Sequence, residues 1–301
     1  METINDNIEV AEVKKPFDIQ WAIDFVKGHK NPVDYRYMVG DSAQVIFFGE
    51  SDHSSSSEKN ELRDNLQQLK DLGITHLALE RFDSNVQPFV DNFLKEKERG
   101  VARIRLGTKL ALSNWEKTTL KEYLQLLDEA KRIGLGLLAI DKPFDKSLQD
   151  SGYSKSDAGI IERNEYWSDV LVDFFKKNPN TKVAIVCGAG HCGYTLPIQS
   201  CNRLLESRGI PTIVINFIGV TNVPFIDWFE NILYEDSPME KPQENMGNYQ
   251  RLFGRASYDA GFSKEGFMLD LRSLQNERPA DFFIHLPQIE AHPTMKLLLE
   301  D

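Results

Sequence analysis

The chain has 301 residues, of which 41% are hydrophobic and 27% are charged, and this is enough to build a sizeable packed core. Its formal net charge of −11 argues against unaided binding of nucleic acid and against docking on an anionic membrane. The charge is compatible with a small-molecule, peptide or protein substrate, and the composition predicts no particular oligomeric state.

The absence of a recognisable secretory signal and the odd number of cysteines predict a cytoplasmic protein. Residues 1–15 lack the basic start and apolar core of a secretory signal, and no apolar run is long enough to span a membrane. The three cysteines, Cys187, Cys192 and Cys201, are an odd number, so we expect reduced, small buried thiols. A protein exported by a signal-less route has the same features, so that route stays open.

The apolar periodicity predicts alternating helices and strands. Helices are expected over residues 17–29, from Ser55 to Gly73 with a capping box at Ser55 and Glu58, over 86–99, 115–133 and 157–177, and through Leu204 and Leu205. Strands are expected at residues 44–48, 74–79, 135–140, 182–187, 211–217, 267–271 and 282–286. The order predicts an α/β fold with a mainly parallel sheet flanked by helices and with late short strands.

We find no internal repeat and no linker that divides the chain. The prediction is a flexible N-terminus at residues 1–15, followed by a single α/β domain at 16–301. Residues 220–262 are rich in Pro, Asn and Gly, and are expected to be a long irregular insertion that can act as a flap over a site.

Ionisable residues follow four successive predicted strands. In a parallel sheet, ligands bind beyond the carboxyl ends of the strands, so these side chains are expected to meet at one edge. The candidates are Glu50, Asp52 and His53 after the first strand, Glu80 and Arg81 after the second, Asp141 after the third, and His191 after the fourth. Glycines at 49, 188 and 190 are expected to let the backbone turn tightly and a substrate approach it.

Each candidate also has a purely structural interpretation. Asp52 can cap a helix or face solvent, Glu80 and Arg81 can form an ion pair at the edge of the sheet, and Asp141 can cap the turn before Pro143. An acid directly after a buried strand has little structural reason to be there, and His191 follows a buried strand with glycines on both sides, so Glu50 with His53 and His191 are the stronger functional candidates. Histidines and carboxylates together can hold a divalent cation or activate water as general bases.

The two histidine motifs resemble the Gly-x-x-His motifs of a superfamily that joins the Tiki proteases, TraB proteins, erythromycin esterases and ChaN-like haem-binding proteins. The resemblance spans residues 43–290 and includes a glutamate at the end of the second strand. Three residues separate Gly49 from His53 where the family usually has two, so either His53 or Asp52 can fill that position. The segments that carry the resemblance are the two motifs Gly49–His53 and Gly188–His191, the strand end Glu80–Phe82, Asn114 and Trp115 with 138–141, and 282–287.

The resemblance implies several functions. Tiki proteins are regarded as metal-dependent peptidases, erythromycin esterases as lactone hydrolases with a histidine base and glutamates, and ChaN-like proteins as haem binders. Our preferred prediction is a bacterial hydrolase of an ester, lactone or amide, with catalytic and, if a metal is present, metal-binding roles for Glu50, His53, Glu80 and His191. Arg81, Asp141 and Asp52 are predicted to bind substrate.

Cofactor and partner alternatives stay open at this point. The metal would be Mn, Fe, Co or Zn. A haem-binding protein would take its axial ligand from His191, Cys192 or Tyr194. Because related domains occur in bacterial toxins, the chain can also be an effector domain that acts on a host protein.

Overall fold

The protein is described from a computed structural model, which covers residues 19–51, 53, 55–97, 100–112, 120–145, 147–148, 151–194, 199–218 and 246–287. Eight strands form one sheet in the order β1-β7-β8-β6-β2-β5-β3-β4. The five pairs from β8 to β4 are parallel, whereas β7 pairs antiparallel with both β8 and β1. The predicted mainly parallel α/β fold, including its late short strands, is therefore confirmed. The strands are β1 (Lys30–Asn31), β2 (Val45–Glu50), β3 (His76–Asp83), β4 (Gly136–Asp141), β5 (Val183–Gly188), β6 (Thr212–Ile218), β7 (Phe267–Asp270) and β8 (Phe282–His285).

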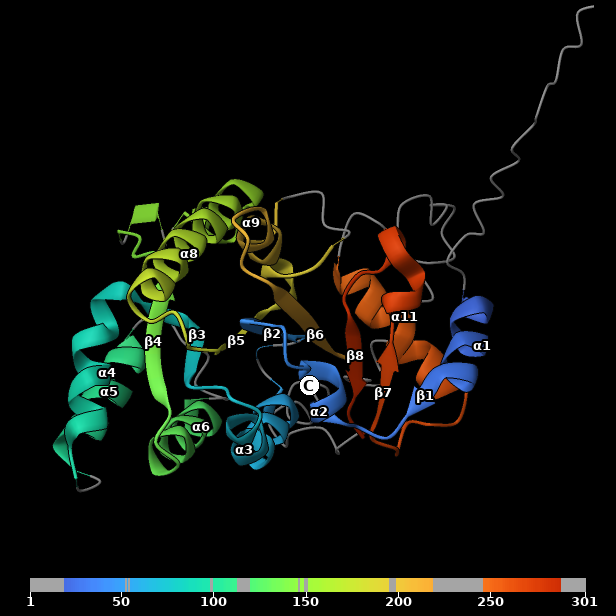
Figure 1. The fold of residues 1–301 in the computed structure, drawn as a ribbon, viewed down its shortest axis with the longest axis horizontal. Helices are drawn as coiled ribbons and strands as arrows, with labels where there is room; N and C mark the ends of the chain where they lie inside the picture. Colours follow the sequence, from blue (N-terminus) through green and yellow to red (C-terminus); the bar gives the residue numbers. More distant parts are fainter. Residues whose placement is uncertain are drawn as a thin grey trace, which may run out of the picture.

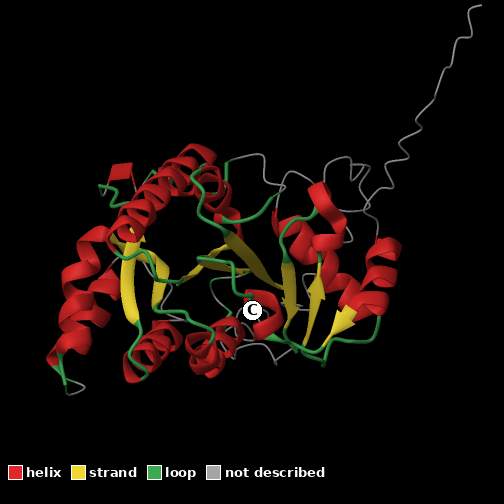
Figure 2. Ribbon diagram, in the orientation of Figure 1, coloured by secondary structure: helices red, strands yellow, loops and turns green. Residues whose placement is uncertain are grey.

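Helices cover both faces of the sheet (Figures 1 and 2). In the view of Figure 1, α8 (Asp157–Lys177) and α9 (Cys201–Ser207) lie above the sheet, and α3 (Ser56–Asp71) and α6 (Leu120–Arg132) lie below it. The pair α4 (Gln87–Lys95) and α5 (Val101–Leu112) closes the end beside β4, and α1 (Ile19–His29) packs against α11 (Met246–Asp259) at the other end.

The side chains of the central strand β2 point alternately to the two faces of the sheet and join a separate core on each face. In β2, Val45 and Phe47 join the cluster under α1, α8, α9 and α11, whereas Ile46 and Phe48 join the cluster over α2 (Tyr35–Val39), α3 and α6. All four side chains are fully buried. Successive residues of a strand point to opposite faces, so a continuous apolar run is what a strand covered on both sides requires.

Several local predictions were wrong. Residues 246–259 were expected to be irregular, but they form α11, whose Tyr249, Phe253 and Ala256 are fully buried. The helices α2 and α5 and the short strand β1 were not predicted. The capping box does not form, because Ser55 makes no side-chain cap bond and Glu58 accepts hydrogen bonds from Ser51 instead. The predictions for residues 1–15 and 220–245 lie outside the described residues.

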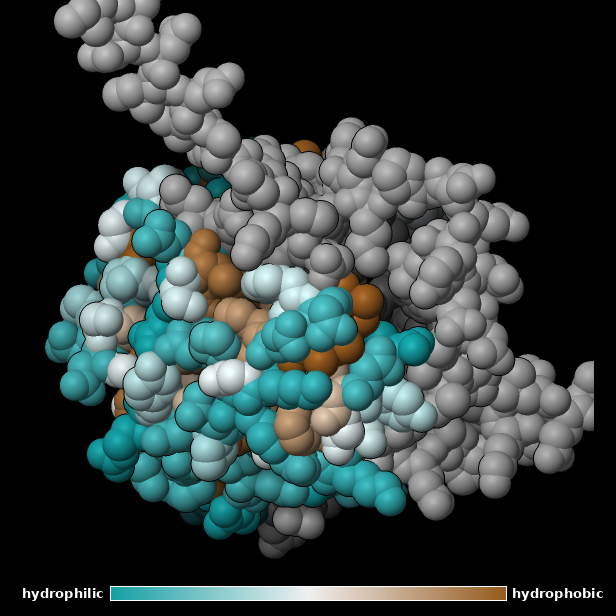
Figure 3. Space-filling model, turned by 90° about the vertical axis from the view of Figure 1, so that its right-hand side faces the viewer, coloured by the Kyte–Doolittle hydropathy of each residue, from teal (hydrophilic) through white to brown (hydrophobic). Residues whose placement is uncertain are grey.

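The outer edge at β1 is short and polar. This strand has only two residues, and the Lys30 ammonium lies 2.6 Å from the Glu265 carboxylate. Figure 3, which views this end of the molecule, shows mostly hydrophilic residues with a few hydrophobic ones between them among the residues it colours. A short, charged edge discourages pairing with another chain.

Of the helices within the described ranges, none combines the length and apolarity needed to span a bilayer.

Gly49 is required for packing and not for a turn. It lies inside β2, paired with Cys187 and Asn216 on the two neighbouring strands. A Cβ at this position would lie 1.8 Å from the Asn216 Oδ1 atom and 3.2 Å from the Cys192 Sγ atom. The expectation of a tight turn at Gly49 was therefore wrong, since the residue leaves room for the side chain of Asn216.

We predict that Gly49→Ala destabilises the protein by about 1–3 kcal/mol, because buried groups must shift to admit the new methyl group. The matched control is Gly28→Ala in α1, where a Cβ meets nothing within 4 Å and where we expect a gain of about 0.5–1 kcal/mol. Urea unfolding of both variants measures the free energies of unfolding. Equal stability of Gly49→Ala and the wild type would contradict this account of Gly49.

Candidate functional site

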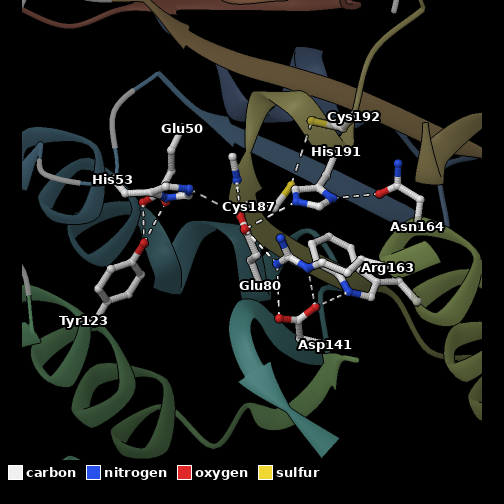
Figure 4. A network of polar contacts seen from close by, with 12 residues as sticks. Glu50, His53, Glu80, Tyr123, Asp141, Arg163, Asn164, Cys187, His191 and Cys192 are labelled. Atoms are coloured by element: carbon white, nitrogen blue, oxygen red, sulfur yellow. Dashed lines mark hydrogen bonds and ion pairs between the residues drawn. The ribbon is translucent and has the colours of Figure 1, made fainter. Parts of the chain in front are cut away.

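Four neighbouring strands, β2, β5, β3 and β4, bring the predicted site residues together. Glu50 is the last residue of β2, Glu80 lies in β3, and Asp141 is the last residue of β4. His191 ends the short 3-10 helix Ala189–His191 that directly follows β5. Because β5 lies between β2 and β3, these groups meet at one edge and form the contact network of Figure 4.

Glu50 is a buried carboxylate with three partners. Its Oε2 atom lies 2.6 Å from His53 Nδ1, its Oε1 atom lies 2.8 Å from the Lys59 ammonium, and the Tyr123 hydroxyl donates to both oxygens. Burial raises the pKa of Glu50, but Lys59 and His53 outweigh burial and hold that pKa below its usual value. Glu50 is therefore ionised at neutral pH and orients the His53 ring through Nδ1.

Glu80 lies between the two histidines. Its Oε1 atom accepts from Arg163 at 2.8 Å and lies 3.4 Å from His191 Nε2, while its Oε2 atom accepts from the Gly188 backbone N–H and lies 3.5 Å from His53 Nε2. Burial opposes ionisation, yet His191, Arg163 and His53 together lower the pKa of Glu80 well below its usual value. Glu80 is therefore a fixed negative charge facing both Nε2 atoms.

His191 is held in one tautomer. Asn164 donates through Nδ2 to the Gln199 carbonyl, so its Oδ1 atom is the acceptor that lies 2.7 Å from His191 Nδ1. The ring also stacks on Trp167, with centroids 4.4 Å apart. Burial lowers the pKa of His191 despite the opposing charge of Glu80, which favours a neutral ring with the proton on Nδ1.

Asp141 positions Arg163 and does not face open space. Its Oδ1 atom accepts from Arg163 Nε and from the Trp167 indole, each at 2.8 Å, and its Oδ2 atom accepts from Arg163 Nη2. Burial raises the pKa of Asp141, although Arg163 opposes this rise. Arg163 thus bridges Asp141 and Glu80 in a fixed geometry.

Gly188 leaves room for the His53 imidazole because it has no side chain. A Cβ at Gly188 would lie 2.9 Å from His53 Nε2 and 3.4 Å from Glu80 Oε2, so any side chain there would displace the imidazole. The backbone of Gly188 is extended, with φ −60° and ψ 140°, and a Cβ at Gly190 would meet nothing within 4 Å. Gly188 is therefore needed for the absence of a side chain and not for a turn, whereas Gly190 lies inside the 3-10 turn Ala189–His191 with open space beside it.

Glu58 supports the segment between Glu50 and His53. It is 2% exposed, and its Oε1 atom accepts from the backbone N–H and the hydroxyl of Ser51. Burial and the charge of Glu50 raise the pKa of Glu58 to about 8 against the opposing charge of Lys59. Glu58 is therefore a neutral acid at pH 7 that anchors Ser51.

Two predicted residues have no described side chain. Asp52 lies outside the described residues, and only the backbone of Arg81 is described, as part of β3. Sequence reasoning missed five members of the network. Their signal is a polar group buried on the core-facing side of a helix, and they are Lys59 on α3, Tyr123 on α6, and Arg163, Asn164 and Trp167 on α8.

The donor set does not fit a divalent metal. Lys59 neutralises Glu50, and Arg163 occupies Glu80, so both predicted carboxylate ligands already carry cationic partners. Within the described ranges, no group of three or more His, Cys, Asp and Glu side chains is arranged to hold a metal ion. The predicted metal site at Glu50, His53, Glu80 and His191 is therefore not supported.

The candidate haem ligands do not fit an axial role. His191 and Cys192 are 4% and 0% exposed, and both nitrogens of His191 face protein groups. The Tyr194 hydroxyl lies within hydrogen-bond distance of Asp281 and Glu206, and burial raises its pKa far above the usual value. The cysteines are buried free thiols, as predicted.

Comparison with known proteins identifies relatives of part of the chain. A model of the family described as "Haem-binding uptake, Tiki superfamily, ChaN" matches residues 40–152. No curated protein matches the chain. The chain spans between 28% and 38% of the length of four bacterial toxin chains. The TM-scores of these four matches are under 0.5, which is too low to indicate a shared fold.

Two solved structures share the fold over most of their length. An erythromycin esterase in its open conformation has a TM-score of 0.54 at 12% identity, with 86% of this chain and 94% of that chain covered. A succinoglycan biosynthesis protein has a TM-score of 0.53 at 12% identity, with 89% and 96% covered. ChaN of Campylobacter jejuni matches at 17% identity over 63% and 88%, with a TM-score of only 0.38. The family match over residues 40–152 and the shared fold confirm the predicted resemblance to the superfamily of Tiki, ChaN-like and erythromycin esterase proteins.

Proposed function

We propose that this protein is a hydrolase of an ester, lactone or amide in which His53 is the general base. The observation that carries the proposal is the placement of His53 between two buried carboxylates, Glu50 at Nδ1 and Glu80 near Nε2. Its side chain is 29% exposed, whereas those of Glu50, Glu80 and His191 are between 1% and 7% exposed. His53 is thus the member of this group that a substrate can reach.

The reaction uses one proton shuttle. With its Nδ1–H donated to Glu50, His53 has a lone pair on Nε2 that takes a proton from water. The resulting hydroxide attacks the carbonyl carbon, and a tetrahedral intermediate forms. When the bond to the leaving group breaks, the Nε2 proton passes to the departing oxygen or nitrogen, and the acid product leaves.

Glu80 stabilises the charge that His53 gains. The carboxylate lies 3.5 Å from Nε2, so it attracts the imidazolium that forms when water is deprotonated. Arg163 and the backbone N–H of Gly188 donate to Glu80 and hold it in place. His191 lies between Glu80 and Asn164 and is buried, so it does not transfer a proton in this proposal.

Haem binding is the second candidate function, and the family match is the observation that favours it. The three axial ligands suggested by the sequence are poorly placed for that role, so we rank it below hydrolysis. Titration of the protein with haem, followed by absorbance in the Soret region, separates the two candidates.

We predict that His53→Ala lowers the rate of ester or lactone hydrolysis by about 10²–10⁴-fold, because it removes the general base. The rate is measured on a panel of 4-nitrophenyl esters and small lactones, with circular dichroism as a check on folding. The control is His29→Ala, at the exposed end of α1, which should keep the wild-type rate. A His53→Ala variant that hydrolyses the panel at the wild-type rate would remove His53 from the mechanism.

We further expect the hydrolysis rate and the melting temperature to be unchanged after dialysis against a chelator. Lys59 and Arg163 already compensate the charges of Glu50 and Glu80, so a removed metal ion would leave no uncompensated carboxylates there. Metal content by mass spectrometry before and after dialysis is the control. Loss of activity that returns with one added divalent ion would contradict this prediction and restore the metal hypothesis.

Glu58 is expected to make stability fall as the pH rises from about 4.5 to about 8. Its folded-state pKa lies above its unfolded value, so the folded protein keeps a proton that the unfolded chain releases. Glu58→Gln cannot ionise, and its stability relative to the wild type should be greater at pH 8 than at pH 5 by roughly 2–4 kcal/mol. Unfolding of both proteins at the two pH values measures this difference. The same offset at both pH values would show that Glu58 is ionised in the folded protein.

A further inference from the structure

A basic segment stands out from the acidic chain. Residues 95–109 contain six Lys and Arg and two Glu, a net charge of +4, so the rest of the chain carries −11 − 4 = −15. The segment covers the end of α4 and most of α5. A strong local asymmetry of this kind indicates a surface that meets a negatively charged partner.

Four of these cations are available to such a partner. Lys95, Lys97 and Arg105 are exposed and Lys109 is half-buried, and within the described part of the chain none of them forms a side-chain hydrogen bond or an ion pair. Arg103 differs, since it forms a bidentate pair with Asp128. The remaining described carboxylate, Glu96, accepts from the Ala102 backbone N–H at the start of α5.

The same surface carries exposed aliphatic side chains. Val101 and Ile104 are 57% and 67% exposed, the largest values among the large hydrophobic residues within the described ranges. They lie three residues apart on α5, with Arg105 one turn after Val101 and Lys109 one turn after Arg105, while Leu106 and Leu110 bury the opposite face. The outer face of α5 is therefore both apolar and cationic.

A hollow adjoins these residues. It has a volume of about 300 Å³ and lies between α4 and α5, with Phe89, Val101 and Arg105 in its lining. Figure 1 shows the two helices together at the end of the molecule beside β4, and α5 contacts both α4 and α6.

We propose that the α4–α5 surface, formed by Lys95, Lys97, Val101, Ile104, Arg105 and Lys109, docks the protein on an anionic phospholipid membrane. The cations attract the headgroups, and the two aliphatic side chains enter the interface beyond them. This combination favours lipid over nucleic acid, because a nucleic-acid surface uses aromatic stacking or polar groups between its cations. Because the chain as a whole carries a net charge of −11, an anionic membrane attracts this surface and repels the rest of the protein. Docking therefore requires that this surface face the membrane.

Co-sedimentation of the full chain with lipid vesicles tests the proposal. We expect binding to vesicles of phosphatidylcholine with phosphatidylserine, no binding to phosphatidylcholine alone, and loss of binding at high salt. The double variant Arg105→Glu with Lys109→Glu should bind at least roughly 30-fold more weakly, since each cation near the surface contributes about 1 kcal/mol. Val101→Ser with Ile104→Ser should weaken binding and keep its salt dependence.

The matched control is Lys176→Glu with Lys177→Glu at the exposed end of α8, which makes the same change in net charge far along the chain. It should keep binding close to that of the wild type. The proposal is overturned if no vesicle binds, if neutral vesicles bind equally, if the control loses as much binding as the α5 variant, or if the chain binds DNA and not vesicles. Hydrolysis takes no part in this experiment, so its outcome is independent of the proposed catalytic function.

Discussion

The burial of two carboxylates, Glu50 and Glu80, at one edge of the sheet is the constraint on which the site depends. An unpaired buried carboxylate would take up a proton or destabilise the fold. Glu50 and Glu80 are ionised because Lys59 and Arg163 are buried beside them, and Asp141 holds the guanidinium of Arg163 in register with Glu80. Catalytic groups and structural charges therefore form one network, in which removal of either cation would change the ionisation of the acid–base residues.

The sequence predicts the strands better than the network. The central strands are continuous apolar runs, so their positions, the parallel sheet and the meeting of Glu50, Glu80, Asp141 and His191 at one edge followed from the chain order. Lys59, Tyr123, Arg163 and Asn164 did not, because they come from helices whose rotation about their axes is set by tertiary packing. The region 246–259 was missed for a related reason, since its Gly and Asn content obscured a helix that is stabilised by packing against α1 and β6.

Glycine had a different meaning in the structure from the one that spacing suggested. Glycines after strands commonly mark turns, yet Gly49 makes room for Asn216 and Gly188 makes room for His53. Only Gly188 belongs to a close contact with an imidazole, and that imidazole comes from the other histidine motif. The sequence could not show this contact, because it depends on the placement of strands β2 and β5 side by side.

The charge balance of the network favours the imidazolium of His53, which forms when this residue takes a proton from water. Glu50, Glu80 and Asp141 contribute three negative charges against two positive charges from Lys59 and Arg163, so the site carries one excess negative charge when both histidines are neutral. When His53 takes a proton from water, the imidazolium balances the excess charge of the carboxylates, and the hydroxide passes its negative charge to the carbonyl group that it attacks. The carboxylates thus stabilise the imidazolium more than the resting imidazole, and this difference is what lowers the barrier to water activation.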